Sequence, residues 1–151
     1  MANKDFKSYL SQLEDILQIY LVKKAPVLPT NFKEAVVNFA PWVTLILMIL
    51  ALPLVLAIFG LGAVLAPFSF LGGMHAGANY FISFGLSAVS LVMEALAIPG
   101  LFKKTQKGWY LVYYASLVGV LQNVINFNLG GLIVGSLLGL YLLFQVKSYY
   151  K

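Results

Sequence analysis

Four long apolar runs constrain the fold of this chain more than any other feature. They cover about residues 41–66, 76–98, 108–127 and 130–146, and Glu94 is the only charged residue within them. Of the 151 residues, 61% are hydrophobic and 10% are charged, whereas a typical soluble domain has about 25% charged residues. A soluble chain of this length cannot bury so much apolar surface in one core, so we expect the runs to face lipid.

The lysines lie on one side of a four-span arrangement. They occur before the first run, between the second and third, and after the fourth, at positions 4, 7, 23, 24, 33, 103, 104, 107, 147 and 151. The other two connections, 67–75 and 127–131, contain neither lysine nor acidic residues. Lysine-rich connections stay in the cytoplasm. The pattern therefore predicts a multi-pass protein of the cytoplasmic (inner) membrane with cytoplasmic N- and C-termini.

The predicted fold class is all-α integral membrane. We expect a four-helix transmembrane bundle of two hairpins over residues 39–151, preceded by an N-terminal arm, residues 1–38, that carries a cytoplasmic-side amphipathic helix. Between residues 5 and 22, apolar side chains recur at helical spacing. This face attaches to the membrane surface, caps the bundle or binds a soluble partner, and surface attachment is favoured. Asn31 and Glu34 have capping-box spacing, which predicts a second short helix.

Two of the runs do not match the thickness of a membrane. As a straight helix, residues 41–66 would reach about 39 Å, whereas the hydrocarbon core is about 30 Å thick. Pro53 lies near the middle of this run and predicts a kink, because proline lacks a backbone donor and clashes with the preceding turn. Residues 130–146 are fewer, and would stand nearly upright or thin the bilayer locally.

A face of small residues marks the fourth run. Gly131, Gly135 and Gly139 recur every four residues, and we call them the glycine face. Without side chains, two membrane helices can approach closely and gain packing energy. The glycine face is either an internal seam against a neighbouring span or an interface between subunits. The internal seam is favoured, since four spans must first pack on one another.

Glu94 is the first member of a candidate polar pathway. A carboxylate within a span usually faces the interior of a bundle or a water-filled cavity. If the helix ends near Pro99, Glu94 lies close to the headgroups, within reach of a lysine. If it continues to Phe102, Glu94 lies about 13 Å from Lys103 along the helix axis, well inside the membrane. The structural or interfacial role is favoured over proton or cation handling.

The end of the third run supplies the remaining members of this pathway, Gln122, Asn123 and Asn126. Gln122 and Asn126 lie one turn apart on the same helix face. These amides either line a polar vestibule or form hydrogen bonds between helices. The second role is favoured, because amides in membrane bundles mostly join neighbouring helices.

The sequence lacks the residues that most enzyme active sites and metal sites require. The chain has no cysteine and a single histidine, His75, whereas a catalytic zinc ion needs about three protein ligands. Acidic residues that could pair for acid–base chemistry are missing from the apolar runs. We therefore expect no enzymatic activity, no metal and no cofactor. Nucleic acid is not an expected partner, since the lysines flank apolar runs instead of forming a patch.

The function that follows is that of a small membrane protein without a catalytic site. We expect a scaffold or accessory subunit that self-associates through the glycine face, with the lipid bilayer and a homo-oligomer or larger membrane complex as partners. The alternative is an oligomeric channel or transporter for a proton, small cation or small polar solute. In that alternative, Glu94 and the amides of the third run line the route.

Overall fold

The computed structural model describes residues 2–151, and every regular element within them is helical. In chain order these elements are α1 (Ala2–Gln18), the π-helical η1 (Ile19–Lys24), α2 (Thr30–Leu65), the 3-10 helix η2 (Ala66–Gly72), α3 (Met74–Phe102), α4 (Gln106–Ile125), the π-helical η3 (Gly131–Leu137), α5 (Leu138–Gln145) and the 3-10 turn η4 (Lys147–Tyr149). The predicted all-helical class is confirmed.

Three helical stretches within residues 2–151 are long and apolar enough to cross a membrane. They are Thr30–Leu50, Val55–Gly72 and Met74–Phe102, of which the first two belong to α2 and its continuation η2. Gly131–Gln145 is a shorter apolar helix. The tyrosine, tryptophan and amide side chains of α4 lower its hydropathy. The apolar helices indicate a membrane protein, as the composition predicts.

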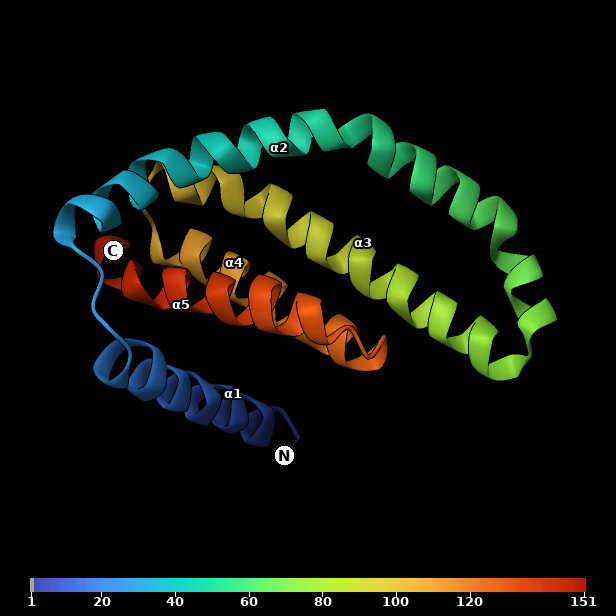
Figure 1. Cartoon of the computed structure of the whole chain (residues 1–151), viewed down its shortest axis with the longest axis horizontal. Helices are drawn as coiled ribbons and strands as arrows, with labels where there is room; N and C mark the ends of the chain where they lie inside the picture. Colours follow the sequence, from blue (N-terminus) through green and yellow to red (C-terminus); the bar gives the residue numbers. More distant parts are fainter. Residues whose placement is uncertain (1) are drawn as a thin grey trace.

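α2 differs from the prediction at its beginning. Instead of a separate short helix before residue 41, one helix runs without interruption from Thr30 through Pro41 and Pro53 to Leu65. The boundary placed between residues 38 and 39 therefore falls inside a helix. A proline removes one backbone hydrogen bond, whereas ending the helix would leave several backbone groups unpaired in an apolar environment. Figure 1 shows α2 bending between its cyan and green parts.

The helices form two hairpins of unequal length, with α1 beside them (Figure 1). α2 and α3 make the longer hairpin, closed by η2 and by Gly73, whose φ of 97° lies in the left-handed region. α4 and α5 make the shorter one, and α4 packs along the C-terminal part of α3. The start of α2, the end of α3, the start of α4 and the C-terminus all lie at the same end of the molecule.

The core lies at that shared end. Its buried members come from α2, α3, α4, α5 and the C-terminal segment: Val37, Ala97, Leu101, Trp109, Tyr113, Leu140, Phe144, Val146 and Tyr150. Farther along α2 and α3, leucine, isoleucine and valine side chains point outwards on most faces. A helix that is apolar on all faces needs an apolar environment around it. This arrangement of exposed apolar surface suits lipid.

α1 uses only part of its apolar face within the chain. Leu17 and Leu21 pack against the core, and the Gln145 Nε2 atom donates a hydrogen bond to the Leu21 carbonyl oxygen at 2.8 Å. Phe6 and Tyr9 remain 63% and 69% exposed. A second apolar strip of α1 is therefore left free. Its attachment to the membrane surface stays a prediction.

Candidate functional site

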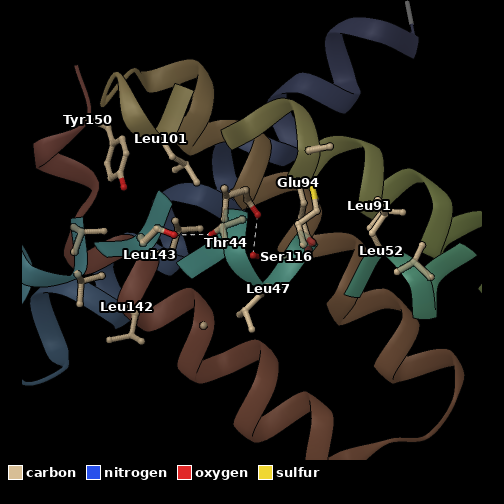
Figure 2. Close-up of a pocket in the computed structure, with 18 residues that line it drawn as sticks. Thr44, Leu47, Leu52, Leu91, Glu94, Leu101, Ser116, Leu142, Leu143 and Tyr150 are labelled. Atoms are coloured by element: carbon tan, nitrogen blue, oxygen red, sulfur yellow. Dashed lines mark hydrogen bonds between the residues drawn. The ribbon is translucent and has the colours of Figure 1, made fainter. Parts of the chain in front are cut away.

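The candidate site is a cavity of about 570 Å³ between α2 and the other three long helices, partly open to the surroundings. Its wall consists mainly of leucine, valine and alanine side chains from α2, α3, α4 and α5, and Tyr150 lies at one end (Figure 2). α2 contacts α3 less extensively than α4 does, and it makes little contact with α5. The cavity therefore follows from α2 standing apart from the α4–α5 hairpin.

Glu94 supplies the only charged side chain of this wall. In the view of Figure 2 it lies with Thr44 and Ser116 in the middle of the lining. The hydroxyl groups of Thr44 and Ser116 each donate a 2.8 Å hydrogen bond to a carbonyl oxygen of their own helix, on Ala40 and Val112. With these hydrogens already donated, the two hydroxyl oxygens can only accept further hydrogen bonds. Together with the carboxylate, they make the polar part of the cavity rich in acceptors.

The position of Glu94 follows from the continuation of α3 through Pro99 to Phe102. Nine residues of helix separate it from Lys103, which corresponds to about 13 Å along the axis. Lys104 does not reach back to it, because its Nζ atom donates a 2.8 Å hydrogen bond to the Asn38 side chain. Among the described residues, the carboxylate of Glu94 forms neither an ion pair nor a hydrogen bond.

The three predicted amides lie in a separate layer, nearer the far end of α4. Gln122 Nε2 donates hydrogen bonds to the Ser83 carbonyl oxygen at 3.0 Å and to Ser87 Oγ at 2.7 Å, which joins α4 to α3. Asn123 Nδ2 donates to Ser136 Oγ of η3 at 3.2 Å. Asn126 Oδ1 accepts a 3.4 Å hydrogen bond from the Ser83 hydroxyl.

These amides do not share a site with Glu94. Glu94 follows Ser87 by seven positions in α3, about 10 Å along the helix. The amides occupy contacts between helices, and none of them lines the cavity. The candidate polar pathway therefore consists of two separate parts. The amides join neighbouring helices, whereas Glu94 lines the open cavity.

The three residues of the glycine face also lie in different surroundings. A Cβ atom on Gly131 would clash with the side chains of Asn123 and Asn128, so this glycine lies in a close contact within the chain. At Gly135 and Gly139, by contrast, no described atom comes within 4 Å of such a Cβ. Gly139 also lines the cavity. Of the three glycines, only Gly131 therefore lies in a close contact within the described chain. Both the internal seam and the interface between subunits stay predictions.

A close backbone contact between α3 and α4 involves two other glycines, which were not predicted from the sequence. A Cβ on Gly108 would lie 2.5 Å from the carbonyl carbon of Gly100 and 2.7 Å from the amide nitrogen of Leu101. The start of α4 thus touches the end of α3 directly. Thr105 caps α4 here, because its Oγ1 accepts a 3.3 Å hydrogen bond from the Gly108 amide. In the sequence, the signal for this contact is a pair of glycines, one on each side of a lysine-rich turn.

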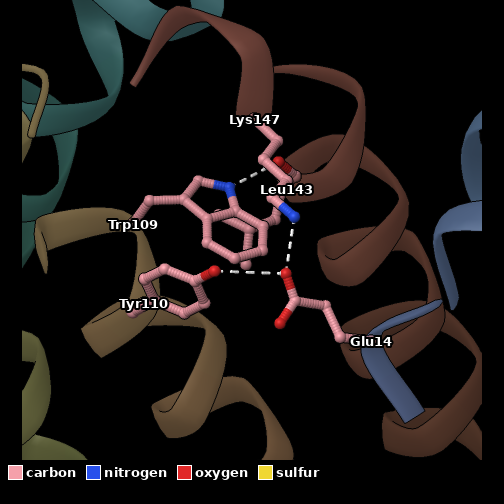
Figure 3. A network of polar contacts seen from close by, with 5 residues as sticks. All are labelled: Glu14, Trp109, Tyr110, Leu143 and Lys147. Atoms are coloured by element: carbon pink, nitrogen blue, oxygen red, sulfur yellow. Dashed lines mark hydrogen bonds and ion pairs between the residues drawn. The ribbon is translucent and has the colours of Figure 1, made fainter. Parts of the chain in front are cut away.

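A polar network between α1, α4 and α5 was also missed (Figure 3). Glu14 Oε1 forms a 2.5 Å ion pair with Lys147 Nζ and accepts a 3.3 Å hydrogen bond from the Tyr110 hydroxyl. Trp109 Nε1 donates to the Leu143 carbonyl oxygen at 2.9 Å. Both charged side chains are partly buried. The network fixes the C-terminal half of α1 against the core.

The structure brings no metal-binding group together in residues 2–151: histidine and acidic side chains do not cluster in threes. His75 lies exposed at the start of α3, far along the longer hairpin from Glu94.

Comparison with known proteins gives no relative, since no family model, curated protein or solved structure matches the chain.

Proposed function

We propose that the chain is a small polytopic protein of the cytoplasmic membrane, with α2, α3, α4 and the helix η3–α5 as its four spans and both termini in the cytoplasm. In this proposal it is not an enzyme. It acts as a scaffold or accessory subunit that associates laterally with a second copy through Gly135 and Gly139. The observation that carries the proposal is the open part of the glycine face, which no described atom covers.

Contacts among the lysine-bearing segments support this topology. The Lys151 amide donates a 2.9 Å hydrogen bond to the Lys104 carbonyl oxygen, and the Gln106 amide donates a 3.2 Å bond to the Lys151 carbonyl oxygen. Lys104 also reaches Asn38 at the start of α2. The segments before, between and after the hairpins thus meet at one end, where the positive-inside rule places the cytoplasm.

The depth of the amide layer supports four spans. About 30 Å of α3 separates Lys103 from Ser83, which equals the thickness of the hydrocarbon core. Ser83 is joined to Gln122 and Asn126, so the end of α4 lies at the same depth as Ser83. The short α4–α5 hairpin then crosses the whole hydrocarbon layer. α3 continues for about 13 Å beyond Ser83. In the proposal, the turn of the longer hairpin therefore lies at the outer surface.

The hydrogen bonds that the three amides make to adjacent helices favour a scaffold over the alternative of a channel or transporter. A route for ions or polar solutes needs polar groups that remain free to bind them along its length. Gln122, Asn123 and Asn126 instead bond to serine side chains and backbone on adjacent helices. Glu94 is separated from them along α3. A continuous polar route would have to be completed by other subunits.

The glycine face suits a second copy of the same chain. A two-fold axis parallel to the membrane normal would bring Gly135 and Gly139 of one η3–α5 helix against the same residues of the other, as in a self-complementary interface. Close approach of the two backbones supplies the van der Waals contact that drives helix association in lipid. Gly139 borders the cavity, so the partner helix would lie next to α5 at one edge of the cavity.

Oxidative crosslinking of single cysteines tests this proposal, because the natural chain contains no cysteine. We expect Gly139→Cys and Gly135→Cys to give a crosslinked dimer in native membranes after mild oxidation. Gly85→Cys is the matched control: Gly85 lies on α3 and is likewise free of contacts within 4 Å. It should remain monomeric. If the α5 cysteines stay monomeric, or crosslink no more than Gly85→Cys, self-association through this face is wrong.

A further inference from the structure

We propose that the cavity between α2 and the α3–α5 helices binds a lipophilic ammonium ion, an apolar body that carries one protonated nitrogen, with the nitrogen paired to Glu94. The volume of about 570 Å³ lies within the range of small-molecule sites, which is roughly 300–1,000 Å³. Such sites combine a mainly apolar wall with a few placed polar groups. This cavity has that composition.

The charge of the ligand follows from the carboxylate. An ionised carboxylate in an apolar environment is costly unless an opposite charge accompanies it. Among the described residues, no basic side chain pairs with Glu94: Lys104 is bound to Asn38, and Lys147 is bound to Glu14. A ligand with a single positive charge would compensate Glu94 without leaving excess charge in the cavity.

The hydrogen-bonding groups favour a nitrogen that carries hydrogens. Thr44 and Ser116 already donate their hydroxyl hydrogens to backbone carbonyl oxygens, so they offer acceptors to a ligand. Glu94 in its ionised form also only accepts. A protonated amine has N–H donors for these acceptors, whereas an anion or a carbonyl group does not.

The apolar wall distinguishes an organic cation from a metal ion. Hard cations such as Ca²⁺ take six to eight oxygen ligands. The carboxylate of Glu94 and the hydroxyl groups of Thr44, Ser116 and Tyr150 fall short of that number. The rest of the wall consists of side chains such as Leu47, Leu52 and Leu91 (Figure 2). These leucines match an aliphatic body. The partly open side of the cavity gives such a ligand access.

Binding of decylamine to the full chain in phosphatidylcholine nanodiscs tests the proposal, with decanol as the uncharged probe of equal chain length. Calorimetric titration, corrected with empty nanodiscs, should show saturable binding of decylamine at one site per chain and none for decanol. Glu94→Gln should weaken decylamine binding at least tenfold. Glu34→Gln removes a carboxylate at the start of α2, outside the cavity, and should leave binding unchanged.

A second variant keeps the carboxylate of Glu94 and fills part of the cavity with a larger side chain. Ala95 lines the cavity, and Ala95→Leu should reduce decylamine binding while Glu94 is intact. Both variants should elute as the wild-type protein does in mild detergent, which shows that they fold. Equal binding by wild type and Glu94→Gln, equal binding of decanol, or no saturable binding at all would overturn the proposal. None of these results depends on dimer formation, which the cysteine crosslinks measure separately.

Discussion

Replacing Trp109 with alanine is expected to lower the free energy of unfolding by about 3–5 kcal/mol, the usual cost of removing a buried tryptophan. Trp109 is 1% exposed. Its ring stacks on Tyr113 with the centroids 5.4 Å apart and meets Phe144 edge-on at 5.3 Å. Its Nε1 atom donates to Leu143 of α5, so the substitution also leaves that carbonyl oxygen without its partner. Thermal unfolding in mild detergent, followed by circular dichroism, measures the loss.

Trp42→Ala is the matched control for this substitution. Trp42 is 55% exposed on α2, and the aromatic ring it contacts, that of Phe102, is itself exposed. We expect an effect below about 1 kcal/mol, which is typical of positions outside the core. If the two tryptophan variants unfold at the same temperature, Trp109 does not hold α4 and α5 together as described.

Gly108→Ala is expected to destabilise the protein by about 3 kcal/mol, the upper part of the usual range for overpacking. The added Cβ would lie 2.5 Å from the Gly100 carbonyl carbon, closer than non-bonded atoms approach. Because the obstacle is backbone, no side-chain rotation relieves it, and the start of α4 has to move away from α3. The same unfolding measurement detects the loss.

The control for this variant lies on the same helix. Gly119 has no described atom within 4 Å of its Cβ position. Gly119→Ala should therefore be neutral or should stabilise the protein by up to about 1 kcal/mol, since alanine is the better helix former. Unfolding temperatures that rise equally in both variants would show that α3 and α4 do not touch at Gly100 and Gly108.

Local patterns in the sequence predicted the helices well. The apolar runs at 76–98, 108–127 and 130–146 lie within a few residues of α3, α4 and η3–α5, because each run ends at polar, glycine or lysine residues that interrupt the apolar pattern. The start of α2 was wrong, because Asn31, Glu34 and Pro41 carry the local signals of a boundary. These local signals do not include the free-energy cost of leaving backbone groups unpaired in an apolar environment. That cost keeps the helix continuous.

The site depends on contacts that no local pattern encodes. Glu14 and Lys147 are separated by almost the whole chain, and their pairing requires α1 to fold back onto α5. The cavity around Glu94 exists because α2 bends and stands away from α5, a result of three-dimensional packing. The sequence did identify Glu94 as the exceptional charge. What surrounds it could be known only from the arrangement of four helices.

Accessibility of single cysteines to a membrane-impermeant maleimide tests the proposed topology most directly. Leu71→Cys in η2 and Leu129→Cys between α4 and η3 replace exposed residues at the two lysine-free turns. Lys103→Cys and Ser148→Cys replace exposed residues in lysine-bearing segments. In intact cells, we expect the first pair alone to be labelled, and the second pair to be labelled only after lysis. Labelling of Ser148→Cys from outside, or protection of Leu129→Cys, would contradict it.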